Sequence, residues 1–184
     1  MVEIPIVQCA IDDGRRVPLP FKHLRVYTLP TSSAGHSCYG WLLLDVWNRY
    51  QDVPGLLWLE ADVAVDPTHL EEIRLLLEQD DDQVIAVPYL LYPSSTHLSR
   101  PVWPFYVYDD HGERRILSGR DVPPRHPLSF GLGCTYLPAR LLEFARPYLH
   151  DWDYPVLDSR LSAVAAAEGV PITTTQTPAI HLNY

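Results

Sequence analysis

Two acidic side chains come directly after a short apolar run. The run spans residues 56–59, and Glu60 and Asp62 follow it with Ala61 between them. In an extended chain, residues two apart point the same way, so both carboxylates would face one ligand. Two neighbouring carboxylates repel each other and are costly to bury unless a cation lies between them. Oxygen ligands suit Mg²⁺ or Mn²⁺, so the pattern indicates a divalent metal that holds a phosphate group.

A solvated turn before a helix is the alternative for these two residues, and spacing alone favours it. Asp66-Pro67 is typical of a helix start, with an aspartate N-cap and proline at the first helical position. Thr68 and Glu71 offer a second capping box for the same helix. We assign Asp66 and Thr68 to capping and keep both interpretations for Glu60 and Asp62.

The elements around these residues predict an α/β fold. A continuous apolar run this short suits a strand buried on both faces, and ligands of such sheets bind at the carboxyl ends of the strands. Apolar patterns and turn residues predict further strands at residues 4–11, 24–29 and 84–87, with a hairpin at 105–108 and 114–117. Helices are expected at residues 37–50, 68–79, 139–145 and from Asp158 to Gly169. We expect Cys38, Trp41, Leu42 and Val46 to form the buried face of the first helix.

Composition limits the classes of partner. The chain has 184 residues and a formal net charge of −9, which argues against nucleic acid and anionic membranes. Three widely spaced cysteines, the absence of a signal-peptide pattern and the absence of a long apolar run predict a cytoplasmic protein with no membrane insertion. The Asp80-Asp81-Asp82 run is interpreted as a solvated turn.

The acidic strand end, followed by a proline-led helix, resembles the metal-binding D-x-D motif of GT-A-fold glycosyltransferases, with Glu60 in the first acidic position. The family 2-like branch, in its small stand-alone bacterial or phage form, shares the order of motifs. The resemblance implies one GT-A-like (Rossmann-like) domain over residues 1–184. It also implies a central mostly parallel sheet flanked by helices, with the small β-hairpin near the acceptor side. A phage-encoded protein would act in the host cytoplasm.

Two further residues gain roles from this resemblance. Asp158, at the start of the last helix, matches the family's general base, although Leu157 stands where the family has a glutamate. His181, after a short terminal strand, matches a late metal ligand, and imidazole suits Mn²⁺ better than Mg²⁺. The plain alternatives are a helix N-cap for Asp158 and a satisfied surface or core histidine for His181.

The remaining candidates are expected to contact substrate. The donor side comprises Thr28, Pro30, Ser37, Asp12, Asp13 and Ala61. The sugar and acceptor side comprises Gly131, Gly133, Trp103, Trp152 and Asp153. A turn is the alternative for Asp12 and Asp13, an N-cap for Ser37, and a core position for Trp103.

Together these observations predict a metal-dependent, inverting glycosyltransferase that is hexosyltransferase-like. Its donor would be a nucleotide-diphosphate sugar, with a UDP-sugar as the preferred candidate. Its acceptor would be an unidentified hydroxyl, and its metal would be Mn²⁺ or Mg²⁺. A catalytically inactive nucleotide-sugar or carbohydrate-binding protein on the same fold, or a metal-dependent hydrolase, is the alternative. The sequence does not identify the sugar, the acceptor or the oligomeric state.

Overall fold

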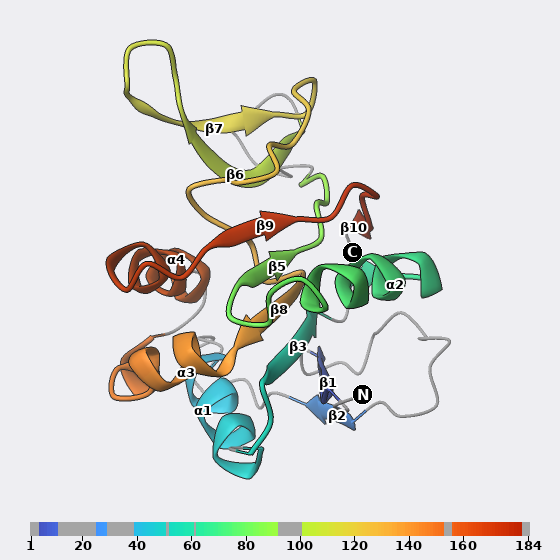
Figure 1. Ribbon diagram of the computed structural model, residues 1–184, viewed down its shortest axis with the longest axis vertical. Helices are drawn as coiled ribbons and strands as arrows, with labels where there is room; N and C mark the ends of the chain where they lie inside the picture. The colour runs from blue at the N-terminus through green and yellow to red at the C-terminus, as the bar shows by residue number, and fades with distance from the viewer. Residues whose placement is uncertain are drawn as a thin grey trace.

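The computed structural model describes residues 4–10, 25–28, 39–50, 52–60, 62–91, 101–152 and 156–181. Its centre is a six-stranded sheet with helices on both faces and the strand order β2-β1-β3-β8-β5-β9 (Figure 1). The strands are β1 (Ile6–Ala10), β2 (Arg25–Thr28), β3 (Gly55–Glu60), β5 (Val84–Ala86), β8 (Cys134–Pro138) and β9 (Ile172–Thr174).

One strand of this sheet runs against the others. β1 pairs in parallel with β2 and β3, and β5 pairs in parallel with β9. β8 lies between β3 and β5 and is antiparallel to both, so the remaining five strands share one direction. The predicted α/β class with a central sheet flanked by helices is confirmed. β3 and β5, the two strands that enclose α2 in the sequence, are therefore not neighbours in the sheet, because β8 separates them.

Alternate residues of β3 enter two different hydrophobic cores, as expected of a strand buried on both faces. Leu56 and Trp58 face the core formed with α1 (Tyr39–Arg49), α3 (Ala139–Ala145) and α4 (Leu157–Ala167). Leu57 and Leu59 face the core formed with α2 (Pro67–Leu77). The carboxyl end of β3 is therefore held rigidly from both sides.

Helix starts and faces differ from the expectations in two places. Asp66 caps α2 with Pro67 at the first position, but the capping box closes through His69 rather than through Thr68 and Glu71. Trp41 is 55% exposed and does not belong to the buried face of α1. That face consists of Tyr39, Gly40, Leu43, Val46 and Trp47. Leu42 is partly buried against the same core, and Cys38 lies outside the described residues.

Two small sheets complete the fold. β6 (Val102–Tyr108) and β7 (Arg114–Ser118) form the predicted hairpin, which projects beyond β9 in Figure 1. β4 (Val63–Ala64) pairs with β10 (Ile180–His181) beside the end of β3. A 3₁₀ turn (Leu149–Asp151) precedes α4.

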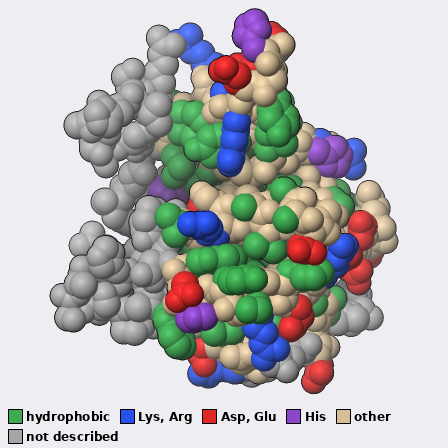
Figure 2. Space-filling view, turned by 90° about the vertical axis from the view of Figure 1, so that its left-hand side faces the viewer, with side chains coloured by type: hydrophobic (Ala, Val, Ile, Leu, Met, Phe, Trp, Pro, Cys, Tyr) green, Lys and Arg blue, Asp and Glu red, His purple; other side chains and the backbone are tan. Residues whose placement is uncertain are grey.

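On the face shown in Figure 2, hydrophobic side chains lie among acidic and basic ones over the hairpin and the helices below it. The Asp80-Asp81-Asp82 run follows α2 as a solvent-exposed turn, and Asp82 pairs with Arg140 at 3.0 Å. Among the described residues, no helix has both the length and the apolar character required to cross a bilayer.

Candidate metal site

Glu60 is the last residue of β3, and the backbone fixes it in place. Its N–H donates to the carbonyl oxygen of Gly133 at 2.8 Å, and its Cα lies opposite Cys9 of β1. Asp62 follows two residues later, with 34% of its side chain exposed. Both carboxylates thus lie at the carboxyl edge of the parallel strands, where α/β sheets bind ligands.

His181 reaches the same edge from the other end of the chain. It lies opposite Val63 in the antiparallel pair of β10 and β4, one residue from Asp62. Its Nε2 is 3.4 Å from Oδ2 of Asp62, and its ring stacks on Tyr89 with centroids 5.4 Å apart and planes 14° apart. The imidazole is 13% exposed. Register and stacking together fix the position of the ring.

The segment that leads to His181 is anchored to the start of α2. Asp66 N–H donates to His69 Nδ1 at 3.0 Å, which leaves Nε2 of His69 to donate to the carbonyl oxygen of Pro178 at 3.2 Å. His69 is buried, so this link is shielded from water. The cap of α2 thereby also positions the strand that carries His181.

Glu60, Asp62 and His181 form a group that could hold a metal ion. One ligand atom from each lies within 4.8 Å of the other two. Two carboxylates and one imidazole suit Mn²⁺ well and Mg²⁺ less well, because Mg²⁺ takes oxygen ligands almost exclusively. The group confirms that a metal site is geometrically possible here, and it leaves the metal unidentified.

The electrostatics of Glu60 point in the same direction. Burial, followed by the neighbouring charges of Asp62 and Asp158, raises its pKa from 4.5 to about 8. The carboxylates of Asp62 and Asp158 therefore lie close to Glu60, whose own carboxyl group is poorly solvated. A bound cation would oppose both causes and favour the ionised carboxylate.

Asp158 lies beside this group. Together with Glu60 and His181 it lines a cavity of about 110 Å³, which Tyr39, Tyr89, Leu91, Pro104, Leu132 and Leu157 complete. It is the second residue of α4, and Val156 occupies the N-cap, so the N-cap alternative for Asp158 is wrong. Burial raises the pKa of Asp158, while hydrogen bonds from Ser159 oppose the rise. A partly buried carboxylate of raised pKa is suited to accept a proton from a bound hydroxyl.

Gly131 and Gly133 have a structural role beside the candidate site. A Cβ added to Gly133 would lie 2.4 Å from Cε1 of Tyr89, and one added to Gly131 would lie 2.5 Å from its hydroxyl oxygen. The N–H of Gly133 donates to that oxygen at 3.3 Å. Both glycines therefore make room for Tyr89, which in turn supports His181. No pattern of residues around Tyr89 marked it in the sequence.

The other acceptor-side candidates lie elsewhere. Trp103 is 7% exposed, and its Nε1 donates to the carbonyl oxygen of Asp121 at 2.9 Å, in agreement with the core interpretation. Trp152 stacks on Tyr148 at 6.0 Å and packs against the core beside α1. Neither tryptophan is among the described residues that line the cavity with Glu60 and Asp158.

The donor-side candidates are only partly described. Thr28 ends β2 opposite Ala10 of β1, at the same edge of the sheet as Glu60. The other candidates on this side, and one on the acceptor side, lie outside the described residues: Asp12, Asp13, Pro30, Ser37, Ala61 and Asp153.

Comparison with known proteins gives a likeness at the level of the fold. No family model matches the sequence, and no curated protein matches it. Among solved structures, the chain is similar to the "Crystal Structure of A197 from STIV", with a TM-score of 0.58 and 14% identity. The alignment covers 98% of this chain and 87% of that one. At this identity the likeness concerns the fold alone.

Proposed function

We propose that the chain is a metal-dependent glycosyltransferase of the GT-A, family 2-like type. It would move a sugar from a nucleotide-diphosphate donor to an acceptor hydroxyl. The observation that carries the proposal is the convergence of Glu60, Asp62 and His181 within 4.8 Å, beside a cavity that Asp158 also lines. These residues come from three separate parts of the sequence, and their types match the roles the reaction requires.

The proposed reaction is a single displacement at the anomeric carbon. The acceptor oxygen bonds to that carbon as the bond to the diphosphate oxygen breaks, and one displacement inverts the configuration. Asp158 accepts the proton of the acceptor hydroxyl. Glu60, Asp62 and His181 hold the cation. When bound, the cation supplies positive charge that stabilises the departing diphosphate.

The arrangement of the sheet supports a donor site at the same edge. β1, β2 and β3 are parallel, and Thr28 and Glu60 stand at the carboxyl ends of β2 and β3. Ligands of α/β sheets bind in the crevice outside such strand ends. A UDP-sugar placed there would have its diphosphate at the candidate metal site.

One observation favours a second candidate, a non-catalytic nucleotide-sugar or carbohydrate-binding protein. Leu157, which stands where the family has a glutamate, is 2% exposed and belongs to the core. Asp158 is the only acidic residue in the first turn of α4, so the acidic pair of the family is incomplete in this chain. A binding protein needs the cation and the donor pocket but no base.

A two-part experiment tests both candidates. Thermal shifts are measured with UDP-glucose, UDP-galactose, UDP-N-acetylglucosamine and GDP-mannose, each with and without Mn²⁺. Release of the nucleoside diphosphate is then followed with the donors that bind. Stabilisation that needs donor and metal together, with diphosphate release, supports the transferase. The same stabilisation without release supports the binding protein. Hydrolysis of p-nitrophenyl phosphate with no donor preference points to a hydrolase, and the absence of any metal-dependent donor binding refutes both candidates.

A further inference from the structure

A second, larger cavity lies away from the candidate metal site. It has a volume of about 740 Å³, within the range of about 300–1,000 Å³ that small-molecule sites occupy. Its walls come from α2, from the base of the β6–β7 hairpin and from the segment that follows β9. The described lining residues share no member with the smaller cavity that contains Glu60 and Asp158.

Half of the described residues that line this cavity are apolar. Leu76, Pro88 and Trp103 contribute to it, and Trp103 is buried. Leu75 and Val122, at 45% and 87% exposed, are large apolar side chains left open to solvent beside it. Binding of a hydrophobic ligand is favourable here, because it removes this apolar surface from water.

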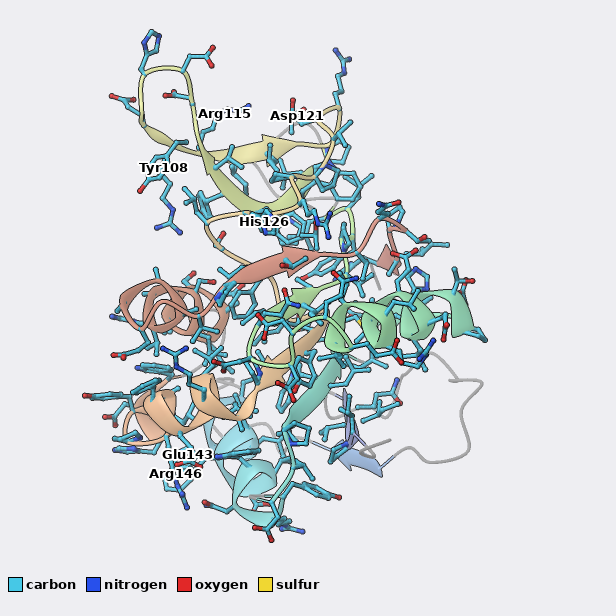
Figure 3. The ribbon with its side chains drawn as sticks, viewed as in Figure 1. Tyr108, Arg115, Asp121, His126, Glu143 and Arg146 are labelled. Carbon is cyan, nitrogen blue, oxygen red and sulfur yellow. The ribbon has the colours of Figure 1, made fainter. Side chains whose placement is uncertain are left out.

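Most polar groups in the wall are already satisfied. Glu72 accepts hydrogen bonds from the N–H groups of Gln176 and Thr177 and from the hydroxyl of Thr177. Asp121 accepts from Ser118 N–H at 2.8 Å and pairs with Arg115 at 3.3 Å. Figure 3 labels Arg115 and Asp121. These two carboxylates therefore have partners without a ligand.

Arg125 is the cation of the wall. Its backbone is fixed, because Thr174 N–H donates to its carbonyl oxygen at 3.0 Å, and its side chain is exposed. Within the described part of the chain, no hydrogen bond or ion pair engages its guanidinium. A guanidinium beside an apolar wall matches a ligand with a hydrophobic body and one anionic group.

We propose that this cavity binds a small amphipathic anion, with its hydrophobic body against Leu76, Pro88 and Trp103 and its anionic group on Arg125. The site is separate from the candidate metal centre and does not depend on the function proposed for it. Carboxylate, sulfonate and phosphate ligands share the chemistry required.

Paired probes test the proposal with the full chain in EDTA. 8-Anilinonaphthalene-1-sulfonate has an apolar aromatic body and one negative charge, and N-phenyl-1-naphthylamine has nearly the same body without the charge. We expect the sulfonate to bind at one site. Arg125→Gln should weaken it about tenfold, the loss expected for a charge-assisted hydrogen bond, and should leave the neutral probe within about twofold.

Two variants complete the test. Arg120→Gln removes an exposed arginine of the same hairpin base that does not line the cavity, and it should change neither affinity. Gln176→Trp places a large side chain in the cavity and should abolish binding of both probes, with a circular dichroism spectrum like that of the unmodified protein. Equal effects of R125Q and R120Q would overturn the proposal, as would binding of both probes to the Q176W variant at unchanged affinity.

Discussion

Nε2 of His181 lies 3.4 Å from Oδ2 of Asp62, although 119 positions (181 minus 62) separate the two residues in the sequence. The pairing of β4 with β10 brings them together, and Tyr89 stacks on the face of the imidazole. In the absence of a metal the contact is a weak polar pair at the rim of the site. Asp62 is 34% exposed, and surface ion pairs contribute little to stability, so stability alone does not explain why the two groups lie together. Both belong to the group that could hold a metal ion.

The first prediction concerns metal binding. Mn²⁺ at a hundred times its dissociation constant should add about 2.7 kcal/mol to the free energy of unfolding, which corresponds to about 5–10 °C in Tm for a chain of this size. Asp62→Asn should abolish that increase, because an amide oxygen is a much weaker ligand than a carboxylate. Asp110→Asn, on the exposed hairpin turn, is the matched control and should keep the full shift. Thermal melts with and without Mn²⁺ check this, and equal shifts in D62N and D110N would contradict the site.

The second prediction concerns pH. The pKa of Glu60 rises from 4.5 to about 8 in the folded protein, chiefly through burial. Between these values the folded state retains a proton that the unfolded chain releases, so the free energy of unfolding falls as pH rises through this interval. Glu60→Gln removes the titrating group. The Tm of E60Q relative to the unmodified protein should therefore increase from pH 5 to pH 8 in EDTA.

Metal binding gives an independent check on the same group. Because the cation binds the ionised carboxylate, the affinity of the unmodified protein for Mn²⁺ should rise with pH, by up to about tenfold per unit below pH 8. Glu113→Gln, on the exposed hairpin turn, is the matched control for the melts and should follow the unmodified protein at every pH. Parallel pH profiles for E60Q and the unmodified protein would show that the pKa of Glu60 is not raised in the folded protein.

The third prediction concerns Asp158 as the base. Asp158→Asn should lower kcat for sugar transfer by about 10²–10⁴-fold, the usual contribution of a positioned proton acceptor. The thermal shift with donor and Mn²⁺ should persist, since Asp158 is not one of the three grouped ligand residues. Glu168→Gln, just after the same helix ends, should leave kcat unchanged. Retention of more than about a tenth of the activity by D158N would exclude this role.

Much of the fold follows from local patterns in the sequence. The apolar run before Glu60 predicted a strand buried on both faces, and its alternate residues do enter two cores. Asp66-Pro67 and Gly169, with φ of +64°, marked helix ends by their backbone preferences. The insertion of β8 between β3 and β5 could not be predicted, because strand order depends on long-range pairing that no local pattern records. Trp41 was wrongly assigned to the buried face, because an apolar residue in a helix can also lie on the side that faces solvent.

The candidate site was predictable in its ligands but not in its support. Side-chain chemistry and the family resemblance pointed to Glu60, Asp62 and His181. The structure adds that these three ligand atoms lie within 4.8 Å of one another. Tyr89 was missed, since a single tyrosine after a strand has no distinguishing spacing. Only its stacking on His181 and its fit against the two glycines reveal its role.

The fourth prediction tests the support that Gly133 gives to His181 through Tyr89. In Gly133→Ala the new Cβ would lie 2.4 Å from Cε1 and 2.7 Å from Cζ of Tyr89, which is only 4% exposed. We expect a loss of about 1–3 kcal/mol in the free energy of unfolding, as for other overpacked cores, together with weaker Mn²⁺ binding. Gly112→Ala is the control: its φ of +76° makes the substitution destabilising, but no atom lies within 4 Å of the new Cβ, so Mn²⁺ affinity should not change.

A double-mutant cycle separates this support from general damage to the core. Tyr89→Leu removes the ring atoms that a Cβ at Gly133 would meet, so the clash in G133A should be relieved when both changes are combined. The cost of the double variant should therefore be smaller than the sum of the single costs by at least about 0.5 kcal/mol. Denaturant unfolding of the four proteins measures this coupling. Strictly additive costs would mean that the destabilisation by G133A does not arise from a clash with Tyr89. Glycine at position 133 would then be required by the backbone conformation alone.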